Sequence, residues 1–211
     1  MLDMAQQPEG ESEMASTTKP RAYHRGNVRE DLIEAALEML KTEGISGLSL
    51  NKMAKSLGVS APAVYNHFRN KEALLAAVAA RGFHKLTAAK EAVLAETAPG
   101  KRRRALSLAY LKFACDEPNL YRLMFRHEIS NRHDYPELIA AENESYGLTV
   151  QLGNQSYDPT RAAQKYPRAF LMWSTLHGMA TLIADKQIRV RTRKDLEYLA
   201  DIIADGLKSR D

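Results

Sequence analysis

The amino-acid sequence predicts an all-α protein, because three features of it agree. Apolar residues recur at helical spacing through most of the chain, and residues that cap helices stand at the starts of these segments. Between residues 48 and 71, two short helical patterns are separated only by a tight turn at Gly58. No stretch shows the alternation of apolar and polar residues that is typical of a β-strand.

The composition is that of a globular protein rather than a secreted or membrane protein. Of the 211 residues, 45% are hydrophobic, which is enough for a substantial core. The single cysteine, Cys115, excludes an intramolecular disulfide and fits a reducing compartment. The acidic N-terminal segment lacks the apolar core of a secretory signal, and no run reaches the ~18 apolar residues of a membrane span. We therefore expect a soluble, cytoplasmic protein.

The segment from residue 48 to residue 71 reads as a helix-turn-helix unit. Ser49 is a good N-cap for the first helix, and Gly58 stands where a left-handed residue ends it. Ser60 caps the second helix, and Pro62 lies in its first turn, where a missing amide hydrogen costs little. The second helix of such a unit can enter the major groove of DNA.

The charge and the outer face of this unit support DNA binding. Val59, Val64 and Phe68 turn inward by their spacing, which leaves the other residues of the second helix outside. No Asp or Glu occurs between Gly44 and Lys71. Such a local bias of sign attracts a phosphate backbone. The cations of this segment are Lys52, Lys55, Arg69 and Lys71.

We expect three segments along the chain. Residues 1–20 are polar and without helical period, which indicates a disordered tail. Residues 21–70 form the helix-turn-helix domain, with a basic arm at Arg21, His24 and Arg25 and a first helix from Asn27 to Gly44. Residues 71–211 form a second helical domain. Its predicted helices cover about 71–96, 105–115, 118–125, 136–152, 167–186 and 194–208, with a loop at 153–159.

The last two helices predict a homodimer. The helix around 170–184 is apolar on nearly every side, so it needs burial on every side. The final helix carries a broad apolar stripe suited to pack beside it, and Gly178 is suited to the close approach of another backbone. Two helices from each of two subunits, about 167–186 and 194–208, would form a four-helix bundle.

The run AALEMLKTEGISGLSLNKMAKSLGVSAPAVYNHFRNKEALL at residues 35–75 resembles the DNA-binding domain of the tetracycline-repressor-like (TetR) transcriptional regulators. This resemblance implies an N-terminal three-helix domain followed by a helical ligand-binding and dimerisation domain. The pattern Trp173-x-x-x-His177-Gly178 also resembles the branch whose C-terminal domain is named for Trp-His-Gly.

The resemblance also implies roles for individual residues. Residues of the first helix of the unit approach DNA, those of the second lie nearest base edges, and three side chains contact phosphates. Ala61 and Ala63 can touch a thymine methyl but cannot form bidentate hydrogen bonds. Asn66 is the only residue of the second helix with a side-chain amide. The expected DNA-binding residues are Ser49, Asn51, Lys52, Ser60, Ala61, Pro62, Ala63, Tyr65, Asn66, His67 and Lys71.

The second domain contains aromatic and methionine side chains that suit either a core or a mostly apolar ligand site. His177 can be a core histidine or a hydrogen-bonding residue of the site. Cys115 reads as a core thiol, the basic run 101–104 as a solvated face, and His127 with His133 fits no known metal site. The ligand-binding candidates are Phe113, Tyr121, Met124, Phe125, Trp173 and His177.

Together these features predict a homodimeric repressor that reads a palindromic operator and responds to a small apolar ligand, without a metal or a cofactor. Two alternatives stay open: a constitutive DNA-binding protein whose second domain only dimerises, and an activator. An enzyme is not expected, because no nucleophile elbow, phosphate loop or suitably spaced carboxylate pair occurs.

Overall fold

The computed structural model describes residues 27–125, 129–152, 158 and 165–207, and every regular element within these ranges is helical. The predicted all-α fold is confirmed. The expected tail at 1–20, the basic arm at Arg21, His24 and Arg25, and most of the loop at 153–159 lie outside the described residues.

Three helices make up the first part of the fold: α1 (Val28–Gly47), α2 (Leu50–Leu57) and α3 (Ala61–His67). The second part begins with the long helix α4 (Lys71–Glu96). The break expected at Gly44 is present, since its φ of 71° and ψ of −172° are not helical, but α1 resumes for one further turn. Helix α4 has the predicted bounds.

Five α-helices follow. A 3-10 turn, η1 (Pro99–Lys101), precedes α5 (Arg102–Asp116) and α6 (Pro118–Phe125), and a second one, η2 (Arg132–Asp134), precedes α7 (Pro136–Gln151). The chain ends with α8 (Pro167–Ala184) and α9 (Arg193–Gly206). Helix α5 begins three residues before the predicted Ala105, inside the basic run, because Arg102 already adopts helical angles.

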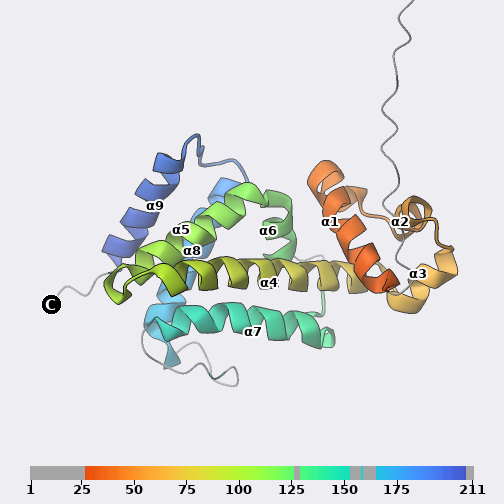
Figure 1. Ribbon diagram of the computed structural model, residues 1–211, viewed down its shortest axis with the longest axis horizontal. Coiled ribbons are helices and arrows are strands. Elements are labelled where there is room, and N and C mark those ends of the chain that lie inside the picture. The colour runs from red at the N-terminus through yellow and green to blue at the C-terminus, as the bar shows by residue number, and fades with distance from the viewer. Residues whose placement is uncertain (1–26, 126–128, 153–157, 159–164, 208–211) are drawn as a thin grey trace, which may run out of the picture.

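Helix α4 is the axis around which the other helices are arranged (Figure 1). Helices α1–α3 lie at its N-terminal end, α5 and α6 lie along one side, and α7 lies along the other. Helices α8 and α9 both pack mainly against α5 and meet each other only briefly. Within a single chain, α5 supplies most of the apolar surface that both helices contact. The expected packing of α9 beside α8 in a dimer stays a prediction.

The apolar core is continuous from the first three helices into the rest of the molecule. Leu32, Leu74 and Leu106 all belong to one cluster of buried side chains. Polar contacts join the same parts: Asn119 Nδ2 of α6 donates to Leu40 O of α1 at 2.9 Å, and Arg81 of α4 pairs with Glu34 at 2.9 Å. The first three helices therefore rely on α4 and α6 for part of their core.

Helix α8 is not buried on every side of a single chain. Phe170 is 44% exposed, Leu171 is 55% exposed, and Leu182 is also exposed. On α9, Tyr198 and Ile202 are exposed as well. Both helices therefore carry exposed apolar side chains. None of the described helices is both long enough and apolar enough to cross a membrane.

Candidate DNA-reading surface and candidate ligand pocket

Side-chain caps hold the short helices of the first part in place. Ser49 Oγ accepts a hydrogen bond from Lys52 N at 3.5 Å, and Ser60 Oγ accepts one from Ala63 N at 3.4 Å. Between the two helices, Gly58 adopts the left-handed conformation, with φ 66°. This conformation suits glycine because it has no Cβ. The predicted turn is confirmed.

A small set of buried side chains fixes the angle between α2 and α3. Met53 of α2 and Val64 of α3 are fully buried, and Phe68, which follows α3, is 3% exposed. The guanidinium of Arg29 from α1 lies 5.6 Å from the centre of the Phe68 ring. Because these residues turn inward, the opposite face of α3 is free.

The eleven expected DNA-binding residues lie on α2, the turn, α3 and the first turn of α4. Ser49 and Ala63 are half-buried, and the other nine are exposed. Tyr65 is 49% exposed, so its ring is not part of the core. We call this surface the reading surface. It comprises Ser49, Asn51, Lys52, Ser60, Ala61, Pro62, Ala63, Tyr65, Asn66, His67 and Lys71.

Two cations of the reading surface have partners within the protein. Lys52 Nζ lies 2.8 Å from a carboxylate oxygen of Glu43, and Lys71 Nζ donates to Ile45 O at 3.3 Å. The acid-free segment begins one residue after Glu43, so the sequence pattern missed this pair. The surface is consequently less positive than the count of lysines suggested.

The segment between α6 and α7 is attached to the start of α4. Glu72 Oε1 accepts hydrogen bonds from Ser130 N at 2.9 Å and Asn131 N at 3.4 Å. The guanidinium of Arg69, two residues after α3, lies 5.6 Å from the centre of the Tyr135 ring. Residues just beyond the reading surface are therefore in contact with the segment that leads into α7.

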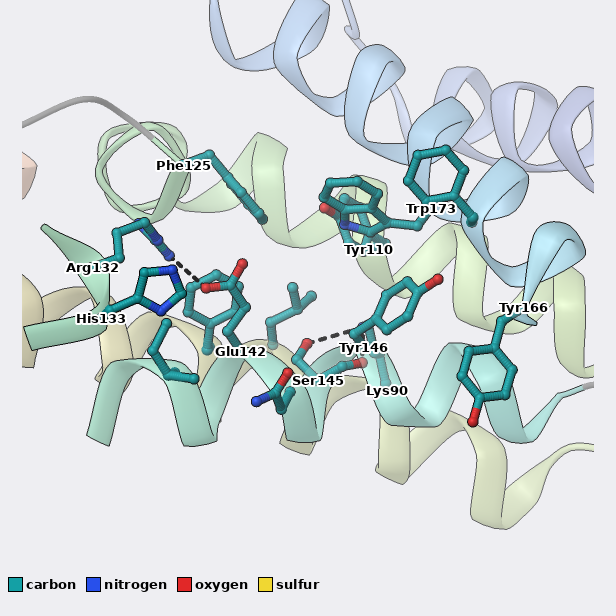
Figure 2. A pocket seen from close by; sticks show the side chains of 15 residues that line it. Lys90, Tyr110, Phe125, Arg132, His133, Glu142, Ser145, Tyr146, Tyr166 and Trp173 are labelled. Atoms are coloured by element: carbon teal, nitrogen blue, oxygen red, sulfur yellow. Dashed lines mark hydrogen bonds and ion pairs between the residues drawn. The ribbon is translucent and has the colours of Figure 1, made fainter. Parts of the chain in front are cut away.

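A pocket of about 510 Å³ lies among α4, α5, α6, α7 and α8 (Figure 2). Its volume is in the range of small-molecule sites. We call it the central pocket. Of the six ligand-binding candidates, it contains Phe125 and Trp173. It is lined by Phe83, Leu86, Lys90, Tyr110, Phe125, Arg132, His133, Ile139, Glu142, Asn143, Ser145, Tyr146, Tyr166, Phe170 and Trp173.

The other four candidates lie elsewhere. Tyr121 and Met124 are buried in the core, and Phe113 lines a separate open groove of about 1110 Å³ beside α9. His177 is half-buried behind the central pocket. Its Nδ1 lies 2.8 Å from Tyr121 Oη, and its ring stacks on Trp173 with a centroid distance of 5.5 Å. Burial lowers the pKa of His177.

The central pocket contains a buried lysine that the sequence reasoning did not identify. Lys90 Nζ donates to Ser145 O at 2.8 Å and to Ser145 Oγ at 3.0 Å. Burial lowers the pKa of Lys90 to about 7. Its spacing of seven residues from Phe83 and four from Leu86 was the available signal, because it places Lys90 on the buried stripe of α4.

An ion pair lies at the end of the pocket nearer α6. Arg132 Nη2 is 2.8 Å from a carboxylate oxygen of Glu142, and Arg132 Nη1 donates to Met124 O at 3.0 Å. Figure 2 shows this pair apart from Lys90 and Ser145 along α7. The pocket thus combines an aromatic lining with a few placed polar groups.

Three further sequence features have plain structural positions. Arg103 Nη1 donates to Leu207 O at 3.3 Å and Arg104 pairs with Asp201, so part of the basic run joins α5 to α9 instead of facing only solvent. Cys115 is half-buried, and burial raises its thiol pKa. His127 lies outside the described residues, within which no cluster of three His, Cys, Asp or Glu is placed to hold a metal ion.

Comparison with known proteins finds two family matches that together cover most of the chain. Residues 32–78 match the family described as "Bacterial regulatory proteins, tetR family", and residues 103–207 match "Tetracyclin repressor-like, C-terminal domain". The second description is not that of the Trp-His-Gly branch, so that assignment stays a prediction.

Relatives of known sequence or structure agree with these matches. The chain is 30% identical to the uncharacterized HTH-type transcriptional regulator Rv0681 of Mycobacterium tuberculosis over 155 residues. This alignment covers 73% of this chain and 69% of that protein. The chain is also 51% identical to tetracycline repressor protein class D of Escherichia coli over 51 residues. This alignment covers 24% of this chain and 23% of that protein. A solved protein of unknown function from Rhodococcus sp. RHA1 superposes with a TM-score of 0.69 at 31% identity, over 87% of this chain and 97% of that chain.

Proposed function

Because this chain belongs to the TetR family of bacterial transcriptional regulators, we propose that it is a cytoplasmic repressor that leaves its operator when a small molecule fills the central pocket. One observation carries the proposal. Helix α4 starts at the reading surface with Lys71 and lines the central pocket with Phe83, Leu86 and Lys90. With 26 residues it is about 39 Å long, so a single rigid element connects the two places.

The first step is recognition of DNA by residues 21–70, with α3 in the major groove. Ala61, Pro62, Ala63 and Asn66 would lie nearest base edges, and Tyr65, His67 and Lys71 would contact phosphates. Their exposure supports these roles, since all of them except the half-buried Ala63 are exposed. From α2, Ser49, Asn51 and Lys52 would approach the neighbouring backbone.

The second step is dimerisation through residues 71–211. The exposed apolar side chains of α8 and α9 support an interface there, because such surfaces on a soluble protein mark contacts. A Cβ placed on Gly178 would meet no heavy atom within 4 Å in a single chain, so a partner helix has room to approach. Two subunits would then present their reading surfaces about 34 Å apart, one turn of DNA.

The third step is coupling between ligand and DNA. Arg132 lines the pocket, and the neighbouring Ser130 and Asn131 bind Glu72 at the start of α4. A ligand that displaces Arg132 or tilts α4 therefore moves the reading surface. By linkage, DNA and ligand then weaken each other's binding to the same extent.

Selection of bound sequences from random DNA tests the first two steps. We expect a palindrome whose half-sites are centred about one helical turn apart. Leu171→Asp on α8 should give monomers by analytical ultracentrifugation and lose affinity for the palindrome, whereas Ala140→Asp, at an exposed position of α7, should change neither. Selection of a single half-site, or a dimer that survives Leu171→Asp, contradicts the proposed assembly.

Operator affinity measured by fluorescence anisotropy at fixed salt tests the third step. Compounds that raise the melting temperature of the protein should weaken operator binding. If operator affinity stays the same at saturation, the protein is a constitutive DNA-binding protein. Whether the operator position makes the regulator a repressor or an activator is tested by expression from a promoter that carries the selected palindrome.

A further inference from the structure

Lys90 stands out among the polar groups of the central pocket because its charge is unmatched. The side chain is 2% exposed. Of its three N–H donors, two have acceptors in Ser145 O and Ser145 Oγ. Within the part of the chain that the structure describes, no acceptor takes the third N–H. The ring of Tyr110 lies beside the ammonium, with its centre 5.5 Å from Nζ.

The acidic group of the pocket is already occupied. Glu142 pairs with Arg132 at 2.8 Å, and among the described residues no carboxylate lies within 4.0 Å of Lys90 Nζ. Tyr110 from α5 and Ser145 from α7 face Lys90 as neutral groups, and α8 contributes the uncharged Phe170 and Trp173 to the lining. A buried ammonium without a counter-ion is costly, and an anion beside it removes that cost.

The rest of the lining is mainly apolar. Phe83 and Leu86 of α4, Phe125 of α6, and Phe170 and Trp173 of α8 surround the space that Lys90 borders. Figure 2 shows Phe125 and Trp173 across the pocket from Ser145 and Lys90. A fitting molecule has an apolar body and one acidic end.

We propose that the central pocket binds an amphipathic organic acid, with its carboxylate at Lys90 and its apolar body among the aromatic side chains. This inference rests on the proposed ligand-responsive function. A charge-assisted hydrogen bond from a buried ammonium to a carboxylate is among the stronger polar contacts, so the acid is selected over an alcohol of the same shape.

The proposal also has a consequence for pH. In the empty pocket Lys90 loses its proton near pH 7, because burial disfavours the charge. A bound carboxylate favours the ammonium, so binding requires the proton. Affinity for the acid should therefore fall about tenfold per pH unit above pH 7. Affinity for the alcohol of the same shape should not fall with pH in this way.

The experiment compares acids with their alcohols by isothermal titration calorimetry on the full-length protein. The probes are octanoate and 1-octanol, decanoate and 1-decanol, and 4-phenylbutanoate and 4-phenyl-1-butanol, at pH 6.5 and pH 8.5. We expect at least one acid to bind about tenfold more tightly than its alcohol at pH 6.5, a factor that corresponds to one charged contact. This preference should shrink at pH 8.5.

Lys90→Met removes the ammonium and keeps the length of the side chain. In this variant the acid and its alcohol should bind equally. Lys85→Met is the matched control: Lys85 lies on the same helix, pairs with Glu117 at 3.5 Å and does not line the central pocket. It should keep the preference for the acid. The pH dependence of the unaltered protein decides the question even if Lys90→Met does not fold.

Three results overturn the inference: no binding by any probe, equal binding of acid and alcohol, or a preference that survives Lys90→Met. None of these results contradicts the proposed function as a regulator, which is tested separately by measuring operator affinity. Conversely, an acid that binds through Lys90 but leaves operator affinity unchanged supports this ligand class and contradicts the proposed regulation.

Discussion

The three helices before α4 and the helices after it are stabilised in different ways. Asn27, Ser49, Ser60 and Asn70 each accept a hydrogen bond from a backbone amide at the start of α1, α2, α3 and α4. Of the helices after α4, α5, α7 and α8 begin without a side-chain cap, whereas α9 is capped by Thr192. A helix of seven or eight residues has few internal hydrogen bonds, so its ends matter most, whereas a long helix is stabilised by burial.

This contrast predicts that outer residues of the reading surface can be substituted without loss of the fold. The caps and the few inward side chains of α2 and α3 determine the local structure, and the outer residues contribute little to it. In the second part, by comparison, the same side chains form both the core and the pocket wall. A substitution that alters the pocket wall therefore also alters the packing of the core.

The largest expected effect separates the two parts directly. Phe68→Ala should destabilise the reading surface by about 3–5 kcal/mol, because it removes a buried ring beneath α3. Hydrogen exchange should then show lost protection in α2 and α3, and operator binding should disappear. Trp173 is the only tryptophan and lies in α8, so its fluorescence should report an unchanged transition for α5–α8.

Phe83→Ala is the matched control in the second part, where the ring packs edge-on against Phe125 at 5.3 Å. It should shift the Trp173 transition. If Phe68→Ala shifts that transition by the same amount, the two parts unfold as one unit and the contrast drawn here is wrong.

A smaller effect concerns the buried charge of the second part. The pKa of Lys90 is about 7 in the folded protein and about 10.4 in an unfolded chain, so between these values the unfolded state binds more protons. Stability should therefore rise with pH from 7 to 9, by at most about 1.4 kcal/mol per unit. Urea unfolding of the protein and of Lys90→Met at pH 7, 8 and 9 isolates this slope, because other groups cancel in the difference. A constant difference contradicts the prediction.

Two substitutions on the reading surface should differ in kind. Asn66→Ala removes the only amide of α3 and should reduce discrimination at one base pair by about 1–3 kcal/mol. Tyr65→Phe removes a donor to phosphate and should weaken binding about tenfold on every sequence alike. Anisotropy titrations with the operator, single-base variants and random DNA distinguish them. Equal losses on all sequences for Asn66→Ala place that residue on the backbone instead.

The smallest expected effect compares two caps. Ser60→Ala at the start of α3 should cost about 1 kcal/mol of helix stability and lower operator affinity severalfold. Thr192→Ala removes the cap of α9, where Thr192 and Asp195 form a capping box, at a similar cost in stability. Operator affinity should not change in the second variant. A loss there implies that α9 influences the reading surface.

The sequence predicted the first part in more detail than the second for the same physical reason. Caps such as Ser49 and the turn at Gly58 are local, so a few neighbouring residues determine them. The bounds of α4 were also predicted correctly, since Asn70 and the apolar stripe are both visible in the sequence. The family resemblance, and with it the role of transcriptional regulator, came from this same segment.

The features that were missed depend on contacts between distant residues. Glu43 of α1 pairs with Lys52 of α2, and Ser145 of α7 meets Lys90 of α4 across 55 residues of chain. The preference of α9 for α5 over α8 likewise depends on which apolar surface lies nearby in space. Residue spacing shows that Lys90 faces inward, but not what it meets there.

The length of α4 gives the molecule a mechanical property. Lys90 lies 19 residues, about 29 Å, from Lys71 along α4, so a tilt of about 5° about Lys90 would carry Lys71 through about 2.5 Å. This is most of the rise of about 3.4 Å between base steps in duplex DNA. In the proposed mechanism, a small displacement at the pocket would therefore shift the reading surface relative to the major groove. If two reading surfaces of a dimer have to fit the same duplex, even a slight tilt of α4 would lower operator affinity.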